Sequence, residues 1–133
     1  MSTQVCVDLP VTDLDRSVAS YEAVGLRVDE RVRDDAAAGV VVDEGVHVML
    51  LTTALDERFT TRRVADAHET SQVVVAVSAE SPAAVDALAD RAVAAGAEPG
   101  TCAVEVPGMH GRAFADPDGH QWGVVHTDPD LFG

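Results

Sequence analysis

The sequence predicts an α+β fold built from two βαβββ modules whose sheets stay open on one face, and three observations predict it. Alternating apolar residues occur near the start of each half of the chain, at Val5–Val11 and again at 73–77, as in half-buried strands. A capped helix follows each of these segments, and three further strand-like segments follow each helix. The same order of elements therefore occurs twice in 133 residues, which indicates an internal repeat.

In the first half, Val5, Val7, Leu9 and Val11 are expected on one face of the first strand, and Cys6, Asp8 and Pro10 on the other. The helix is expected between Asp13, a good N-cap, and Gly25, which can adopt the left-handed conformation that ends a helix. Further strands are expected at 26–33, 39–43 and 46–52. The last two are joined at Glu44-Gly45, a short turn suited to a hairpin.

The second half repeats this pattern. Ser81 is the expected N-cap, Pro82 occupies the first helical position, and Gly96 ends the helix. The following strands are expected at 101–106, 112–116 and 121–127. Asp116-Pro117-Asp118-Gly119 is typical of a tight turn between the last two. We therefore expect one domain over residues 1–133, with module one at 3–52, module two at 72–127, and a linker at 53–71 that has a short helix at its centre.

Each module is too small to bury both faces of its sheet. One face is therefore expected to pack on the helix while the other lines a concave trough, and pairing of modules within the chain or across a dimer is expected. The alternative is a ferredoxin-like α+β domain without duplication of a functional unit.

Composition limits the function. The nine basic residues are all Arg, and 23 acidic residues give a formal charge of −14 and a pI of about 4.4. This balance argues against a nucleic-acid partner. Two widely separated cysteines, Cys6 and Cys102, together with the lack of a signal-peptide pattern or a membrane-length apolar run, favour a cytoplasmic protein with no membrane anchor.

Three segments carry a resemblance to a known family: Leu9 to Tyr21, the strand at 48–52, and Gly111 to Trp122. Their Leu-Pro-Val-x-Asp-Leu and Phe-x-Asp-Pro-Asp-Gly-His-x-Trp motifs resemble the vicinal oxygen chelate superfamily, which includes glyoxalase I, bleomycin-resistance proteins and extradiol dioxygenases. The bacterial lactoylglutathione-lyase-like group is the most similar. The resemblance covers nearly the whole chain, and it implies paired βαβββ modules around an open cavity, usually in a homodimer.

Metal-dependent members of this superfamily place His or Glu at four inward strand positions. The resemblance puts Cys6, Leu50, Gln72 and Gly123 at those positions, and none of them is a His or carboxylate ligand. We therefore predict no metal and no cofactor, and metal-dependent glyoxalase I activity is disfavoured. The assignment depends on strand register, because a shift of one residue exchanges the two faces of a strand.

Other residues complete the candidate site. His110 lies in a glycine-containing segment and is kept as an acid or base at the pocket rim. Asp8 shares the predicted trough face with Cys6, where it either pairs with Arg112 or faces solvent. Trp122 is expected in the core. Of the other histidines, His47 is expected to be partly exposed, His68 to lie at the linker surface, His120 in the turn, and His126 on the face opposite Gly123. The predicted ligand-binding residues are Cys6, Asp8, Leu50, Gln72, His110, Arg112 and Gly123.

Three functions are compatible with these residues. The first is a metal-independent protein that binds a small organic molecule in the trough. The alternative is an enzyme of this superfamily, a lyase, isomerase or dioxygenase, which acts either without metal through His110 or Asp8 or with metal ligands that the motifs do not reveal. The third is a dimeric accessory domain whose cavity has lost its function.

Overall fold

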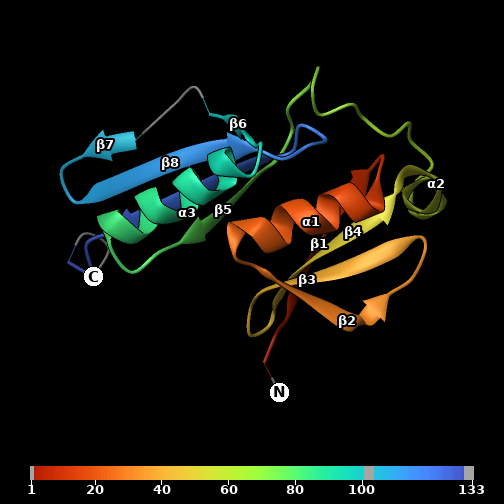
Figure 1. Cartoon of the computed structure of the whole chain (residues 1–133), viewed down its shortest axis with the longest axis horizontal. Coiled ribbons are helices and arrows are strands. Elements are labelled where there is room, and N and C mark those ends of the chain that lie inside the picture. Colours follow the sequence, from red (N-terminus) through yellow and green to blue (C-terminus); the bar gives the residue numbers. More distant parts are fainter. Residues whose placement is uncertain (1, 101–103, 131–133) are drawn as a thin grey trace. The chain divides into compact units, whose positions relative to one another are not determined.

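Residues 2–100 and 104–130 are described by a computed structural model (Figure 1). The chain divides into unit one, residues 1–66, and unit two, residues 67–133. Each unit contains an open mixed sheet and one long helix, so the predicted α+β fold is confirmed. Unit one has the expected βαβββ order, and unit two has the same order except that two short strands, β6 (Glu98–Pro99) and β7 (Val104–Val106), both pair with β8 (Met109–Ala115) where one strand was expected. Among the described residues, no helix is long and apolar enough to cross a membrane.

Unit one contains β1 (Val5–Val11), α1 (Leu14–Val24), β2 (Arg27–Arg33), β3 (Ala37–Asp43) and β4 (Val46–Thr52). Its strand order is β1-β4-β3-β2, with β1 parallel to β4 and the other neighbours antiparallel. The predicted caps of α1 are confirmed. Asp13 accepts a hydrogen bond from the backbone N–H of Arg16 at 3.1 Å, and Gly25 takes the left-handed φ of 108°.

The core of unit one lies between α1 and one face of this sheet. Val18 and Tyr21 of α1 are almost fully buried. The sheet contributes the buried side chains of Leu9, Val11, Val40, Val48 and Leu50. Strand pairing places Leu9 beside Leu50 on this helix-covered face, and Asp8 beside Met49 on the other, which we call the open face.

The segment between the two modules differs from expectation. A short helix, α2 (Thr53–Asp56), and a 3-10 turn, η1 (Glu57–Phe59), follow β4 directly, so the helical turn lies at the start of 53–71 and not at its centre. The Thr52 side chain explains this position, because its hydroxyl oxygen accepts from the backbone N–H of Leu55 at 3.4 Å and caps the turn.

Unit two repeats the arrangement. Its elements are β5 (Val74–Ser78), α3 (Pro82–Ala94), β6 (Glu98–Pro99), β7 (Val104–Val106), β8 (Met109–Ala115) and β9 (Gln121–Thr127). The strand order is β5-β9-β8-β6, with β5 parallel to β9 and β7 also paired to β8. The strand expected at 101–106 is seen as β7, while 101–103, including Cys102, lie outside the described residues. The strand expected at 112–116 begins earlier, at Met109.

An aromatic pair forms the centre of the unit-two core. Trp122 is 1 % exposed, and its ring stacks on Phe114 with ring centroids 6.3 Å apart. Val85, Ala89 and Ala92 of α3 are buried with it. The predicted packing of Trp122 in the core is therefore confirmed. The small alanines let α3 lie close to β8 and β9.

Ionic hydrogen bonds also attach α3 to β8. Arg112 donates to Asp90 at 2.8 Å and to Asp86 at 3.4 Å, and His110 Nε2 donates to Asp86 at 2.9 Å. The hydrogen bond from His110, followed by that from Arg112, holds the pKa of Asp86 below its ordinary value. These contacts keep the Arg112 guanidinium on the α3 side of the sheet.

A tight turn at 116–119 joins β8 to β9. The Asp116 carboxylate accepts from the backbone N–H groups of Asp118 and His120, at 3.0 and 2.8 Å. Gly119 has a φ of 86°, and a Cβ there would lie 2.7 Å from the backbone nitrogen of His68. His68 Nε2 also donates to the Pro117 carbonyl at 3.1 Å. The segment at 67–68 is therefore packed tightly onto this turn.

Asp86→Asn is expected to lower the melting temperature near neutral pH, because the amide loses the negative charge that pairs with His110 and Arg112. A carboxyl whose folded pKa is lowered stabilises the fold above its unfolded pKa, and this contribution disappears as the pH falls through the folded pKa. The difference from the unsubstituted protein should therefore shrink in acid. Thermal unfolding followed by circular dichroism across a pH series measures it, with Asp35→Asn, an exposed carboxylate between β2 and β3, as control. A pH-independent difference would contradict the assignment.

Gly119→Ala is expected to destabilise the protein more than Gly96→Ala. Both glycines have positive φ, but a Cβ at Gly96 meets nothing within 4 Å, so its substitution measures backbone strain alone. We expect Gly96→Ala to lower the free energy of unfolding by about 1–2 kcal/mol. Gly119→Ala should lower it by about 1–3 kcal/mol more, because the added Cβ clashes with residues 67–68. Urea unfolding compares the two variants. Equal losses would show that the segment at 67–68 is not held against the turn.

Candidate functional site

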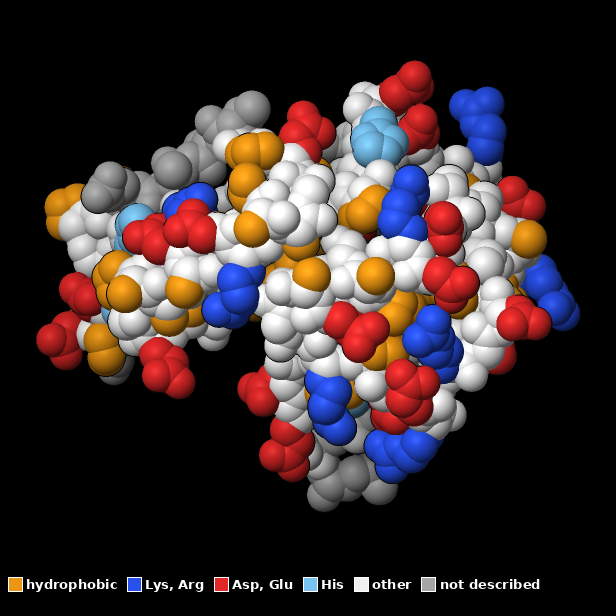
Figure 2. Space-filling view, in the orientation of Figure 1, with side chains coloured by type: hydrophobic (Ala, Val, Ile, Leu, Met, Phe, Trp, Pro, Cys, Tyr) orange, Lys and Arg blue, Asp and Glu red, His pale blue; other side chains and the backbone are white. Residues whose placement is uncertain are grey.

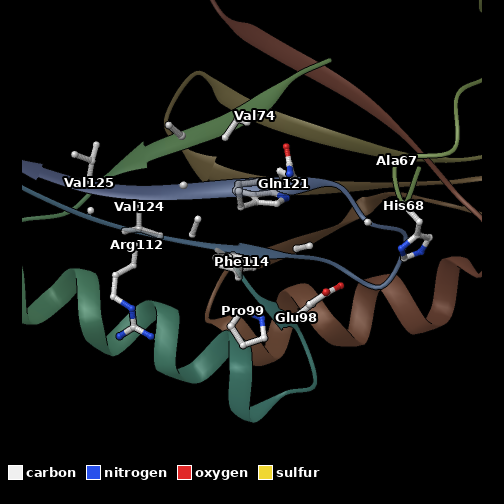
Figure 3. Close-up of a pocket in the computed structure, with 18 of the residues that line it drawn as sticks. Ala67, His68, Val74, Glu98, Pro99, Arg112, Phe114, Gln121, Val124 and Val125 are labelled. Carbon is white, nitrogen blue, oxygen red and sulfur yellow. The ribbon is translucent and has the colours of Figure 1, made fainter. Parts of the chain in front are cut away.

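The open face of the unit-two sheet carries a pocket of about 520 Å³, which we call the unit-two pocket (Figure 3). This volume falls in the range of sites for small organic ligands. All of its lining residues lie between Ala67 and Val125. They come from β5, β6, β8 and β9 and from the segment at 67–68 that packs on the turn before β9.

Very small residues form the floor of the pocket. Strand pairing puts Ala113, Gly123 and Ala76 side by side across three strands. Gly100 extends this row, because its backbone N–H donates to the Ala113 carbonyl at 2.9 Å. No side chain in the row is larger than a methyl group. The floor is therefore flat, and most of its surface consists of backbone and methyl groups.

The two glycines in the floor have different physical roles. A Cβ at Gly100 would lie 2.5 Å from the Ala113 Cβ, so only glycine allows this close approach of the chain to β8. A Cβ at Gly123 would meet nothing nearer than the Ala76 Cβ at 3.6 Å, which is an ordinary contact. The space above Gly123 thus exists because the residue has no side chain, and the backbone there would accept one.

The pocket is polar at one end and apolar at the other. A second row on the open face runs across four strands. In it, Glu98 pairs with Ala115, Ala115 pairs with Gln121, and Gln121 pairs with Val74. Gln121 Oε1 accepts a hydrogen bond from the Ser71 hydroxyl at 2.6 Å. Figure 3 shows Gln121, Glu98 and His68 toward one end and Val125 toward the other. A ligand would meet its polar partners at the first end.

Gly123 is the predicted site residue whose position opens onto this pocket. Arg112 contributes to the lining, but its side chain belongs to the opposite face. It pairs with Val124 across the sheet and points toward α3 (Figure 3). There it forms ion pairs with Asp86 and Asp90. The expectation that its charge lies in the trough is corrected. Alternation along β8 explains this, because Arg112 and Phe114 point toward α3 while Gly111 and Ala113 point away from it.

His110 is also on the helix-covered face, beside His126 and bonded to Asp86. It is absent from the pocket lining, so its predicted place at the rim is corrected for the same reason of strand alternation. His68, expected only at the linker surface, does line the pocket.

Cys6 and Asp8 lie on the open face of unit one, as expected from their alternation with Val7 and Leu9. The Cys6 thiol is 3.7 Å from the Asp8 carboxylate. Partial burial, followed by the charge of Asp8 and this hydrogen bond, raises the pKa of the Cys6 thiol. The thiol therefore stays protonated near neutral pH, which makes Cys6 a poor nucleophile.

Leu50 was expected on the same face as Cys6, and this expectation is wrong. Leu50 is fully buried and pairs with Leu9 and Ala38 on the face that α1 covers. Strand β4 presents His47, Met49 and Leu51 to the other face. The register inferred for β4 is thus shifted by one residue, which exchanges the two faces.

Gln72 was expected at the start of a strand. It is exposed and precedes β5, whose pairing with β9 begins at Val74 opposite Gln121. Gln72 is therefore not an inward strand residue.

The metal positions implied by the resemblance do not fit a divalent ion. Leu50 is apolar and faces α1, Gly123 has no side chain, and Gln72 lies outside the strand. Within residues 2–100 and 104–130, no group of three His, Cys, Asp or Glu side chains is placed to hold a metal. Of the four positions, Cys6 and Gln72 alone carry a donor atom, a thiol whose pKa is raised and a neutral amide oxygen, and these two do not make the His and carboxylate set that a divalent ion requires.

Sequence reasoning missed Glu98 and His68. Glu98 lies on a strand of two residues, too short to show alternation, and only its pairing with Ala115 places it on the open face. His68 belongs to a polar segment without regular structure, and Gly119 holds that segment against the turn. A left-handed glycine in the Asp-Pro-Asp-Gly turn was visible in the sequence, but the segment that packs on it was not.

Solved structures with the same fold support this architecture. A glyoxalase-related enzyme from Fulvimarina pelagi is 21% identical with a TM-score of 0.80, and the match covers 96% of this chain and 89% of that chain. A lactoylglutathione lyase from Agrobacterium tumefaciens is 20% identical with a TM-score of 0.72, and the match covers 100% of this chain and 98% of that chain. A glyoxylase/bleomycin resistance protein/dioxygenase domain from Frankia sp. EAN1pec is 26% identical with a TM-score of 0.70, and the match covers 97% of this chain and 94% of that chain.

No curated protein matches the chain by sequence. The model of the Glyoxalase/Bleomycin resistance protein/Dioxygenase superfamily matches residues 3–124, nearly the whole length. This match agrees with the two open βαβββ units and with the structural relatives. The chain belongs to the glyoxalase/bleomycin resistance protein/dioxygenase superfamily.

Proposed function

We propose that the chain binds a small organic molecule in the unit-two pocket without a resident divalent metal. The observation that carries this proposal is the pocket itself, about 520 Å³ on an open sheet face with a floor of Gly and Ala residues. A mostly apolar pocket with a few polar groups at one end is the usual form of a small-molecule site.

The expected affinity is modest. An apolar ring that buries about 150 Å² gains about 4 kcal/mol from removal of this surface from water, and association entropy offsets part of that gain. The net free energy of binding is then weaker than about −4 kcal/mol, which corresponds to a dissociation constant above about 1 mM, so screening should begin at several millimolar ligand.

The pocket lining includes Glu98 and His68, but it does not include the residues that the sequence named for catalysis. The sequence named His110 and Asp8 as acid–base residues for the alternative, a superfamily enzyme. Neither belongs to the pocket lining, and His110 is bonded to Asp86 on the helix-covered face. The proposal therefore assigns the pocket a role in recognition.

We further propose that the chain acts as a homodimer, as its superfamily membership suggests. Strands β1 and β5 stand at the ends of their sheets. Val5, Val73 and Val74, in or next to these strands, are more than half exposed. Exposed apolar edge strands favour pairing with another strand. Native mass spectrometry tests this proposal, and a monomer at all concentrations would overturn it.

Gly123→Val is expected to abolish ligand binding while the fold persists. The branched side chain fills the space above the floor, and a Cβ at this position meets only ordinary contacts. Valine is also favourable in strands, so we expect a stability change of at most about 1 kcal/mol. The measurement is a fragment screen by ligand-observed NMR, followed by titration of the hits against both proteins.

Ser78→Val is the matched control for this experiment. It places the same valine side chain on the open face of β5, at a residue outside the pocket lining. Hits should bind this variant as they bind the unsubstituted protein. Fragments that bind the Gly123→Val variant equally well, or the absence of any hit, would refute binding in the unit-two pocket.

A further inference from the structure

The charges around the unit-two pocket are strongly one-sided. Apart from His68, Glu98 and Arg112 are the members of the lining with an acidic or basic side chain. Arg112 directs its guanidinium to α3, where Asp86 and Asp90 neutralise it. Glu98 pairs with Ala115 on the open face, and no Arg or His within the described residues forms an ion pair with it. The pocket therefore presents a carboxylate without a compensating positive charge.

The remaining polar groups at that end of the pocket add a complementary donor. Gln121 uses its amide oxygen to accept from Ser71, so its amide nitrogen is the atom that it can offer to a ligand. Glu98 and Gln121 flank Ala115 in one row across the sheet. A ligand edge that carries an N–H donor and a ring acceptor would match this row.

The floor restricts the shape of the ligand. Ala76, Gly123 and Ala113 form an even surface across three strands, with no side chain beyond a methyl group. A flat ring can contact such a surface over its whole area, whereas a puckered ring touches it at a few atoms. Dispersion contacts fall steeply with a gap of less than 1 Å, so the flat ring is favoured.

The surface outside the pocket supports the same preference. The chain has a formal charge of −14, and Figure 2 shows acidic side chains distributed over both units among the arginines. A field of this sign attracts cations and repels anions as they approach.

We propose that the ligand is a flat nitrogen heterocycle or aryl amine, neutral or cationic at neutral pH, which lies on the Gly-Ala floor and donates an N–H to Glu98. This inference rests on the proposed function and specifies its ligand class. Anionic ligands are excluded from the class, because their charge would face the Glu98 carboxylate.

Four probes of one bicyclic skeleton test the proposal: 2-aminoquinoline, 2-methylquinoline, quinoline-2-carboxylate and decahydroquinoline. They supply a flat N–H donor, a flat neutral ring, a flat anion and a puckered cation. Dissociation constants come from NMR titrations of the full chain at fixed pH and ionic strength. We expect 2-aminoquinoline to bind about tenfold more tightly than 2-methylquinoline, as one charge-assisted hydrogen bond provides. The carboxylate and decahydroquinoline should bind most weakly.

Glu98→Gln should remove the advantage of 2-aminoquinoline, strengthen binding of the carboxylate, and leave 2-methylquinoline unchanged. Glu80→Gln is the matched control, since Glu80 is an exposed carboxylate of the same unit outside the pocket lining. It should leave the order of the four probes as it is. A uniform loss in both variants would show a general effect of net charge and would overturn the role of Glu98.

The two proposals fail in different ways. Equal binding of the three flat probes would overturn the charge preference and leave the unit-two pocket as a binding site. Decahydroquinoline binding as tightly as 2-aminoquinoline would overturn the preference for a flat ring. Absence of binding by all four probes at millimolar concentration, together with no fragment hit that Gly123→Val abolishes, would overturn the proposed function itself.

Discussion

Each unit of this protein depends on the burial of one sheet face under one helix. In unit two, Trp122 and Phe114 stack beneath the small alanines of α3, and removal of this apolar surface from water holds helix and sheet together. Because side chains alternate along a strand, the same burial determines what the other face receives. Gly111, Ala113 and Gly123 lie on that face because their neighbours in sequence belong to the core.

The electrostatics of the pocket follow from this division. Arg112 alternates with Gly111 and Ala113, so it falls on the core side of β8, where Asp86 and Asp90 neutralise it. The charge that remains toward the pocket comes from Glu98 on the neighbouring edge strand. An arginine one position earlier or later in β8 would lie on the open face and would neutralise the charge of Glu98. The ligand preference is therefore a consequence of strand register as much as of composition.

The superfamily scaffold carries reactions and binding functions on one fold, so the site has to be read from its own residues. Here a glycine stands where the resemblance implies a carboxylate, and its missing side chain contributes to the floor of the pocket. Because Gly123 has no side chain, this position offers no oxygen to a metal and leaves open space above the floor of the pocket. This links the poor fit to a metal with the presence of an apolar pocket.

The sequence by itself determined the repeat of a strand, a helix and further strands, the caps of α1, the Ser81 N-cap of α3, the burial of Trp122 and the superfamily. These depend on local alternation, capping chemistry and motif residues. The sequence also placed Gly123 in the candidate site. It could not place Leu50, His110, Arg112, Gln72 or Glu98 correctly. A face assignment requires the pairing of strands, and pairing is a tertiary property: one residue of register moved Leu50 into the core, and a two-residue strand paired to β8 brought Glu98 to the pocket.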